Sequence, residues 1–524
     1  MRKLFENGYG PLILLTAILF GFSAGVFFIK FNPQYGFISK NQKKMQDLIY
    51  VIENDYVDVV NTDSIVNKTI NVILSELDPH SKYIAPELTQ MAEEDLNGEF
   101  VGIGISYLKI NDTIVIQRVL KNSPNQGKLF TGDKLLFADQ HSLTGDSIHL
   151  ASKYLKGIEN TKVKILLIRD NDTIIQNLDR KKIINSPIRA SYMINNSVGF
   201  IHLNTFTYNS GELVSNAIDD LKAQGMKTLI LDLRGNGGGF LREAKKIADE
   251  FLSDNKIMYY VKGRGNIKEE TKATEEGDFE QGKLYVLIDE ESASASELLA
   301  GAIQDHDRGT IVGRRSFGKG LVQQEMELSD GSKVRLTTAR YYTPTGRSIQ
   351  KPFSKGEKGL EEYRHENYDR YHSGEMYFMD SIKINDSLKF KTPKGKTVYG
   401  GGGIIPDVFV AVDTLSVGDW YYLQQGKTNI YDYTNQYILK NKTQLKEWGV
   451  DTFNKEFNEE KVYQEYLRRF KKVGKISGKD KKKIQFLLKA LIARNFYGDE
   501  AYFKIYNTSD NVIEKVLELE KTMN

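Results

Sequence analysis

Apolar residues recur along this chain with two different periods, and the change of period divides the sequence into regions. Between residues 40 and 97 they fall at helical spacing, beginning with Met45, Leu48, Ile49 and Ile52. From residue 98 to residue 180, short apolar runs predict strands at 101–105, 113–118, 134–137 and 163–169, and a helix at 147–156. We therefore expect an N-terminal helical region at 40–97 and a small β-rich domain at 98–180.

After Ser186 and Pro187 the pattern changes to alternating strands and helices. It predicts strands at 198–206, 228–233, 256–261, 283–289 and 310–313, and helices at 211–224, 240–252 and 294–305. A hairpin is expected around Asp330-Gly331. Such alternation is typical of a βαβ-type core, in which functional loops gather beyond the carboxyl ends of the strands. We expect this core at 187–411.

Two further stretches complete the expected organisation. A polar, tyrosine-rich insert occupies 351–401 within the core, and its pattern assigns it no role. Residues 412–524 carry helical patterns at 462–470, 484–492 and 512–519, which predict a helical C-terminal region. The predicted fold is therefore multidomain and combines α+β and α/β parts.

The first thirty residues contain a run of 19 residues without charge, Pro11–Ile29, preceded by Arg2 and Lys3. A run of this length suits a signal anchor or transmembrane helix at 1–30. The competing interpretation is a cleaved signal peptide, with small residues at Ser23–Gly25 near the cleavage point. In both cases the positive-inside rule places the rest of the chain outside the cytoplasm. We expect anchoring in the inner membrane with the catalytic domains in the periplasm or outside the cell, or a secreted form.

Composition excludes several classes of function. The chain has 524 residues, 72 of them basic and 69 acidic, so its net charge of +3 gives no electrostatic case for nucleic acid binding. It has no cysteine, which excludes thiol catalysis, disulfides and cysteine-rich zinc sites. Its histidines show no metal-ligand spacing and are read as capping, packing or surface residues: His80, His141, His149, His202, His365 and His372. No metal and no cofactor is expected.

Two stretches come close to nucleotide-binding motifs and fail at a decisive position. Arg234–Gly239 follows a strand and opens a helix, but a dinucleotide fingerprint would need Gly or Ala where Phe240 stands. Gly313–Gly320 approaches a Walker A loop, yet Gly320 replaces the Ser or Thr that would hold magnesium. A nucleotide-dependent enzyme is therefore disfavoured.

A serine cluster, Ser292–Glu297, lies where an apolar strand meets a helix, and Phe317-Gly-Lys-Gly320 follows. A hydroxyl at such a turn is exposed, and the first amides of the helix can stabilise an oxyanion. Lys319 could serve as the base if burial lowered its pKa, and on a strand Gln323 would face the same side. Taken singly, the serines read equally as helix caps and Lys319 as a solvated residue. His306, at the far end of the same helix, is poorly placed to reach the serines.

The chain resembles the carboxyl-terminal processing peptidases, or tail-specific proteases, over roughly residues 40–411. The resemblance rests on six motifs in order: Leu77–Ser81, Asp232–Gly239, Ser292–Glu297, Phe317–Gly320, Tyr342–Gln350 and Gly403–Asp407. It implies a serine/lysine dyad in which Ser294 is the nucleophile, Lys319 the general base and Gln323 its orienting partner. It also implies oxyanion amides at Ala295 and Gly238.

The same resemblance implies a PDZ domain in the β-rich stretch, with Gly102, Ile103, Gly104 and Ile105 as its carboxylate-binding loop. From the residues alone, these glycines could equally mark a bulge in a strand. The expected function is a membrane-anchored extracytoplasmic serine endopeptidase that recognises the exposed apolar C-termini of protein substrates. The C-terminal helices could support a homo-oligomer. The alternative is a catalytically silent, membrane-anchored PDZ adaptor, which would lack proteolysis altogether.

Overall fold

The computed structural model describes residues 15–16, 18–21, 39–110, 112–275, 277–413, 423, 429–472, 476 and 478–523. The chain divides into two compact units, residues 1–73 and 74–524. In the first unit, α3 (Lys40–Asp55) begins at a capping box formed by Ser39 and Gln42, and α4 (Thr62–Ser75) follows. No helix among the described residues combines the length and the apolar character needed to cross a membrane. Apart from 15–16 and 18–21, the predicted anchor at 1–30 lies outside those residues.

A six-stranded sheet forms the centre of the second unit. Its strand order is β10-β11-β12-β15-β16-β21. The pairs from β11 to β21 are parallel, whereas β10 runs antiparallel to β11 at one edge. The strands are β10 (Ile188–Met193), β11 (Val198–Leu203), β12 (Thr228–Asp232), β15 (Lys283–Ile288), β16 (Thr310–Gly313) and β21 (Val408–Phe409). This agrees with the βαβ pattern predicted from the sequence, except that β10 and β21 were not foreseen.

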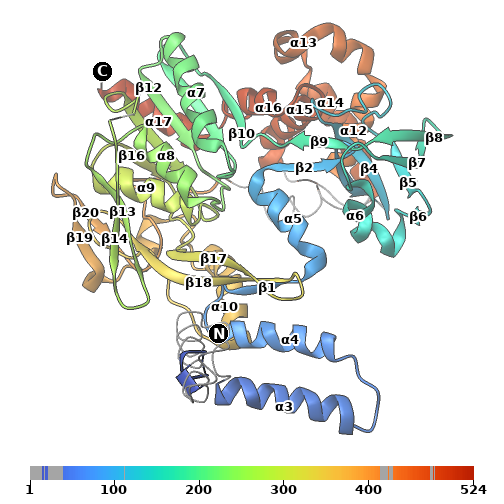
Figure 1. Cartoon of the computed structure of the whole chain (residues 1–524). Coiled ribbons are helices and arrows are strands. Elements are labelled where there is room, and N and C mark those ends of the chain that lie inside the picture. Colours follow the sequence, from blue (N-terminus) through green and yellow to red (C-terminus); the bar gives the residue numbers. More distant parts are fainter. Residues whose placement is uncertain are drawn as a thin grey trace, which may run out of the picture. The chain divides into compact units, whose positions relative to one another are not determined.

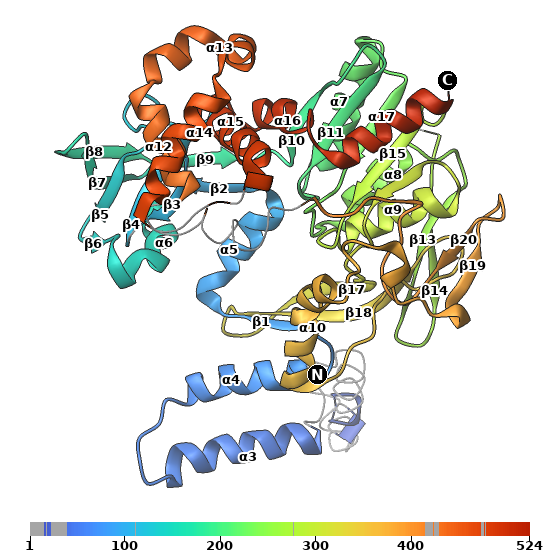
Figure 2. The same ribbon diagram turned by 180° about the vertical axis from the view of Figure 1, so that it is seen from behind.

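Both faces of this sheet are covered, which is why its strands are apolar almost throughout. Ile201 and Leu231 belong to the core that forms beneath α7 (Ser210–Ala223), α8 (Leu241–Asp249) and α9 (Ala295–Asp305). Phe200 and Ile230 point to the opposite face, where they pack with side chains of α17 (Asn511–Met523). Figures 1 and 2 show α17 on the side of the sheet away from α8. The sequence pattern predicted a helix near α17 but assigned it to the C-terminal helical region.

A second sheet lies beside the first and has the order β1-β18-β13-β14, with β17 paired to β18. Its strands are β1 (Lys82–Ile84), β13 (Ile257–Gly263), β14 (Lys268–Lys272), β17 (Leu321–Glu327) and β18 (Lys333–Tyr342). β17 and β18 are the predicted hairpin. β1 falls within a region predicted to be helical, because a strand of three residues is too short to interrupt a helical period. α5 (Pro86–Asn97) follows β1.

The β-rich stretch folds around its own core, which includes Ile114, Leu135 and Val163. Its main sheet has the order β3-β4-β5-β7-β8, with β6 paired to β5, and β2 pairs with β9. The strands are β2 (Glu99–Gly102), β3 (Ile105–Ile110), β4 (Thr113–Val119), β5 (Lys134–Ala138), β6 (His141–Ser142), β7 (Lys162–Arg169), β8 (Asp172–Asp179) and β9 (Lys181–Ile184). The predicted strand at 101–105 is thus two strands, because Gly104 turns the chain with a φ of 75°.

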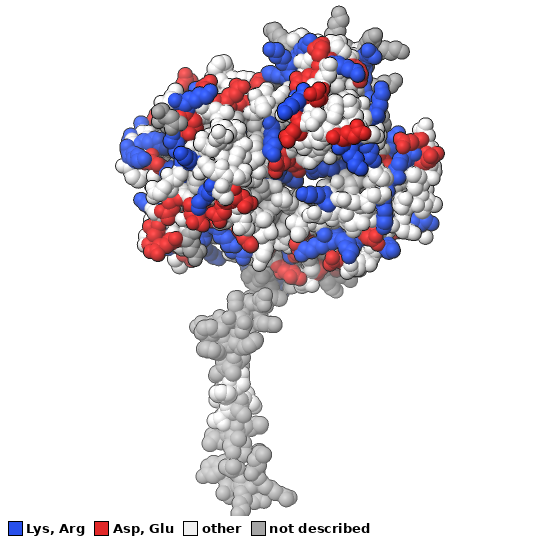
Figure 3. All heavy atoms as spheres, turned by 90° about the horizontal axis from the view of Figure 1, so that it is seen from above, with Lys and Arg blue, Asp and Glu red and all other residues white. Residues whose placement is uncertain are grey.

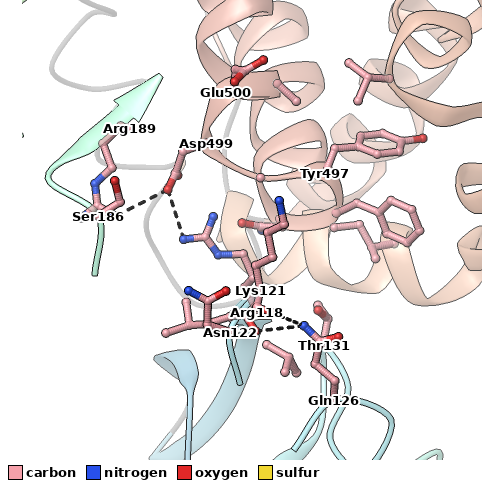
Figure 4. Close-up of a pocket in the computed structure, with 18 of the residues that line it drawn as sticks. Arg118, Lys121, Asn122, Gln126, Thr131, Ser186, Arg189, Tyr497, Asp499 and Glu500 are labelled. Atoms are coloured by element: carbon pink, nitrogen blue, oxygen red, sulfur yellow. Dashed lines mark hydrogen bonds and ion pairs between the residues drawn. The ribbon is translucent and has the colours of Figure 1, made fainter. Parts of the chain in front are cut away.

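C-terminal helices surround a separate aromatic-rich core that contains Tyr433, Phe453 and Tyr466. They are α12 (Ile430–Lys440), α13 (Lys442–Glu456), α14 (Glu459–Leu467), α15 (Lys481–Tyr497) and α16 (Asp499–Tyr506). The Asp499 carboxylate joins three regions, because it lies 3.3 Å from Arg118 of β4, 3.5 Å from Arg189 of β10 and 2.8 Å from Arg494 of α15. Figure 4 shows Asp499 with Arg118 and Arg189, at one wall of a cavity of about 930 Å³.

The insert predicted at 351–401 contains α10 (Gly356–His372) and a small hairpin of β19 (Lys389–Lys391) and β20 (Thr397–Tyr399). Over the face drawn in Figure 3, basic and acidic side chains are interspersed. This distribution is consistent with the nearly balanced charge of the sequence.

One ion pair of the second unit is completely buried. The Arg347 guanidinium donates to Asp305 Oδ1 at 2.7 Å, and neither side chain is exposed to solvent. The same guanidinium also donates to Gln304 Oε1 at 2.7 Å and to the Tyr399 carbonyl oxygen at 2.9 Å. It therefore ties the end of α9 to the insert hairpin.

We expect Arg347→Met to lower the free energy of unfolding by about 3–5 kcal/mol, because the buried Asp305 carboxylate loses its only charged partner. Urea denaturation followed by circular dichroism measures the change. Glu362→Gln is the matched control: it breaks the exposed Lys358–Glu362 pair of α10 and should cost less than about 1 kcal/mol. Equal unfolding midpoints for the two variants would contradict the prediction.

Candidate active site

A cleft of about 1080 Å³ opens where the two sheets approach each other. Ser294 and Lys319 both line it, together with Gln323 and the glycines 237–239. Apolar side chains of α5, including Leu88 and Met91, form another part of its wall. The loops that meet here follow β12 and β15 at their carboxyl ends, as expected for a parallel sheet.

Ser294 stands between β15 and α9 with a φ of 56° and a ψ of −111°. A non-glycine residue in this conformation is strained, and such strain persists only when the surroundings impose it. The neighbouring serines differ from it because both are fully buried: Ser292 Oγ donates to the Leu233 carbonyl oxygen at 2.8 Å, and Ser296 Oγ donates to the Asn236 carbonyl oxygen at 2.8 Å. Of the three serines, only Ser294 lines the cleft.

The glycine loop lies directly against the serine turn. A β-carbon on Gly238 would come within 2.9 Å of Ser294 Cβ and 3.1 Å of the Ala295 nitrogen, and the φ of Gly238 is 102°. Asn236 fixes this approach, because its Oδ1 accepts from the Gly238 nitrogen at 2.9 Å and its carbonyl oxygen accepts from the Ala293 nitrogen at 3.0 Å. The structure thus brings Gly238 and Ala295, the two predicted oxyanion residues, to the same side of Ser294.

Glu297 joins the serine turn to the lysine loop. Its carboxylate accepts four hydrogen bonds, from the nitrogens of Ser294 (2.9 Å), Gly318 (2.6 Å) and Lys319 (2.8 Å) and from Ser316 Oγ (2.5 Å). The residue is fully buried, and burial raises the pKa of its carboxyl above the usual range while the four donors oppose that rise. The sequence motif contained Glu297, but no role was predicted for it.

Lys319 extends from this loop into the cleft, and its Nζ donates to Gln323 Oε1 at 2.8 Å. Burial, aided by the positive charges of Arg335 and Lys82, lowers the pKa of the Lys319 ammonium to about 8, against the opposing effect of Glu297. Arg335 and Lys82 face each other across β18 and β1. At pH 8 about half of the amine would therefore be neutral and able to accept a proton.

Tyr341 contacts the backbone of both Ser294 and Lys319. Its hydroxyl is 3.0 Å from the Ser294 carbonyl oxygen and 2.5 Å from the Lys319 carbonyl oxygen, so it can donate to either. The side chain is buried, and burial raises the pKa of its phenol well above the ordinary value. It remains a neutral donor, and no feature of the sequence signalled this role.

His80 contacts the same cluster through Gln323, whose Nε2 donates to the His80 carbonyl oxygen at 2.6 Å. It was predicted to be a capping or packing residue rather than a ligand, and its ring indeed packs against Phe317 and Tyr363. Within the described residues, no group of three or more Asp, Glu or His side chains is arranged to hold a metal ion.

The predicted carboxylate-binding loop, Gly102–Ile105, lies between β2 and β3 and does not line this cleft. Ile103 is buried, and its carbonyl oxygen accepts from Ser123 Oγ at 2.9 Å and from Asn125 Nδ2 at 3.0 Å. A β-carbon on Gly104 would come within 2.6 Å of the Ser123 side chain. The loop is therefore held in one tight turn at the start of β3.

Comparisons with known proteins were made for the whole chain. Peptidase family S41 matches residues 197–356, and a family of unknown function, DUF8443, matches residues 420–498. A solved photosystem II D1 C-terminal processing protease is 26% identical, covers 61% of this chain and 86% of its own, and gives a TM-score of 0.37.

Two curated relatives are described as probable CtpA-like serine proteases. The one from Staphylococcus aureus (strain MRSA252) is 30% identical over 344 residues, which are 64% of this chain and 68% of the relative. The one from Staphylococcus epidermidis (strain ATCC 12228 / FDA PCI 1200) is 32% identical over 347 residues, which are 64% and 69% of the two chains. The chain therefore belongs to the carboxyl-terminal processing peptidases, and it is a serine-type peptidase of family S41.

Proposed function

We propose that this peptidase cleaves peptide bonds with a dyad in which Ser294 is the nucleophile and Lys319 the general base. The observation that carries the proposal is the shared cleft, in which a strained, accessible serine and a buried lysine are tied to one carboxylate, that of Glu297. The lowered pKa of Lys319 supports the role of base. Gln323 would keep the amine directed towards the serine.

In this mechanism neutral Lys319 takes the proton of Ser294 Oγ while the oxygen attacks the carbonyl carbon of the scissile bond. The Ala295 amide would stabilise the oxyanion that forms. The Gly238 amide, the other predicted donor, already donates to Asn236 Oδ1 and would have to exchange that bond to join it. Collapse of the intermediate breaks the C–N bond, and the Lys319 ammonium returns its proton to the departing amine. Water then attacks the acyl-serine with Lys319 as base again, which releases the new carboxylate and restores the hydroxyl.

We further propose that the β-rich stretch is a PDZ-type domain that binds the free C-terminus of a substrate. Two features support this. Among the described residues β3 pairs only with β4, so its other edge carries no strand there and could accept an added one. The tight Gly102–Ile105 turn precedes that edge, where backbone amides could receive a terminal carboxylate. An apolar tail would lie along β3 and deliver the preceding chain to the cleft.

The proposal includes an extracytoplasmic location, supported by the uncharged run Pro11–Ile29 behind Arg2 and Lys3. Its substrates would be proteins that expose apolar C-termini outside the cytoplasm.

Replacement of either dyad residue should abolish cleavage. We expect Ser294→Ala and Lys319→Ala to lower kcat/KM for an unfolded protein with an apolar tail by about 10⁴-fold or more, because the nucleophile or its base is lost. Ser292→Ala removes a buried, bonded hydroxyl nearby and controls for simple disturbance of the turn. Gel analysis of the products measures the rates. Cleavage by Ser294→Ala at the wild-type rate would eliminate the dyad, and an inert wild-type protein would favour the silent adaptor.

The pH dependence should report Lys319. Because the base must be neutral, log kcat/KM should rise with a slope of about one below pH 8 and level off above it. Arg335→Gln removes a positive charge and leaves Glu325, its ion-pair partner, nearby. The lost positive charge and the remaining negative charge of Glu325 both favour the protonated Lys319 amine. The rising part of the pH profile should therefore move to higher pH by roughly half a unit or more.

Arg335→Lys keeps the charge and is the matched variant for this experiment. It should leave the rising part of the pH profile close to its wild-type position. If the rising part of the pH profile does not move in Arg335→Gln, Lys319 is not the group that titrates.

Recognition of the tail should depend on its carboxylate. We expect C-terminal amidation of a peptide to raise KM at least about tenfold, with kcat little changed, because the charge-assisted hydrogen bonds to the loop are lost. Gly104→Ala should weaken binding of the free-carboxylate peptide similarly, since Gly104 has a φ of 75° and no space for a β-carbon. Steady-state kinetics on the peptide pair measures both effects. Equal KM values for the two peptides on the wild-type protein would contradict a carboxylate site.

A further inference from the structure

The insert at 351–401 packs onto the segment that leads to Lys319. Arg370 of α10 donates to the Arg315 carbonyl oxygen at 2.6 Å and to the Ser316 carbonyl oxygen at 3.2 Å. Glu375 accepts from Arg370 at 2.8 Å and from Arg315 at 2.7 Å. All these charged side chains are buried, so the insert is joined to this segment by bonds that are costly to break.

An aromatic cluster continues the same contact about two turns nearer the start of α10. The Tyr363 ring meets His80 edge to face with centroids 5.1 Å apart, and Phe317 with centroids 5.7 Å apart. The ammonium of Lys351 lies 3.9 Å from the centroids of both Phe317 and Tyr363, and it also pairs with Glu366. Phe317 is thereby enclosed two residues before Lys319.

The Tyr363 hydroxyl is the polar end of this cluster and lies beside two groups. It is 2.9 Å from His80 Nε2 and 3.4 Å from Gln350 Nε2. Tyr363 itself is buried, with 7% of its surface exposed. The shorter contact is the one with His80, and either atom of that pair can be the donor, according to the tautomer of the ring.

His80 connects this hydroxyl to the base. Its carbonyl oxygen accepts from Gln323 Nε2 at 2.6 Å, which turns Gln323 Oε1 towards Lys319 Nζ at 2.8 Å. A carboxamide offers two such ends on opposite sides, so a partner that fixes the nitrogen also fixes the oxygen. An unbroken series of contacts therefore runs from α10 through His80 and Gln323 to the amine.

The imidazole stays neutral in this position. Burial, together with the charges of Lys319, Lys351 and Lys82, lowers the pKa of His80 to about 3, while Asp78 opposes them. Across any working pH the ring thus keeps one donor and one acceptor nitrogen. Its contact with Tyr363 does not change when the amine of Lys319 gains or loses a proton.

We propose that Tyr363 is a positioning residue for Lys319, acting through His80 and Gln323, so that the insert completes the active site. This inference rests on the proposed function of Lys319 as the base. Without the Tyr363 hydroxyl, His80 loses its ring partner, and the Gln323 carboxamide can turn away from the amine. The serine would then be activated less often, although substrate binding in the cleft and in the β-rich domain would be unaffected.

Tyr363→Phe tests the inference because it keeps the ring in the cluster and removes only the hydroxyl. We expect kcat to fall roughly tenfold, since small misplacements of a catalytic group carry penalties of this size. KM and the thermal unfolding midpoint should stay near their wild-type values. Tyr368→Phe is the matched control on α10, where Tyr368 is 65% exposed, and it should leave kcat unchanged.

A double-mutant cycle separates positioning from general support of the fold. In Gln323→Ala the carboxamide is absent, so adding Tyr363→Phe should lower kcat less than about twofold further. A tenfold loss that persists in the Gln323→Ala background would overturn the inference, as would a wild-type kcat in Tyr363→Phe. A Tyr363→Phe protein whose KM rises while kcat holds would overturn it too.

The proposed function and this inference fail in different ways. Undiminished cleavage by Lys319→Ala would remove the base itself, and with it the ground for a positioning residue. If Ser294→Ala and Lys319→Ala are inert while Tyr363→Phe equals the wild type, only the role of the insert is excluded.

Discussion

The geometry of this active site depends on one buried carboxylate. Glu297 has no solvent around it and accepts from two segments of the chain, the turn that holds Ser294 and the loop that holds Lys319. A carboxylate in that position must keep its donors, because burying it with any of them missing is costly. The distance between Ser294 and Lys319 is therefore set by the hydrogen bonds that Glu297, a third residue, requires.

Other parts of the molecule hold this arrangement from outside. Asn236 fixes the glycine loop against the serine turn, and Tyr341 contacts the carbonyl oxygens of both central residues. The insert secures the lysine loop through Arg370 and the aromatic cluster. Each support comes from a different region of the sequence, so the site is assembled only when the sheets, α9 and the insert are all in place.

The sequence was most informative where a local period or an ordered motif carries the signal. It predicted the parallel core, the β17–β18 hairpin and a C-terminal helical region, and the order of its motifs singled out Ser294 and Lys319. It could not predict contacts between distant segments. The period of α17 shows which face of the helix is apolar, but not that Phe200 and Ile230 lie beneath it. Tyr363 stands in a polar stretch without a period, and no role was predicted for Glu297.

The position of α17 has a consequence for folding of the chain during synthesis. Its Glu520 accepts hydrogen bonds from Thr228 of β12 (2.9 Å) and Tyr285 of β15 (3.0 Å), beneath apolar contacts with the same strands. A nascent chain interrupted before residue 511 would expose one whole face of the central sheet. The two strands that lead to the glycine loop and to Ser294 therefore gain their final support last. The loops that follow these strands would then reach their final packing only once synthesis has passed α17.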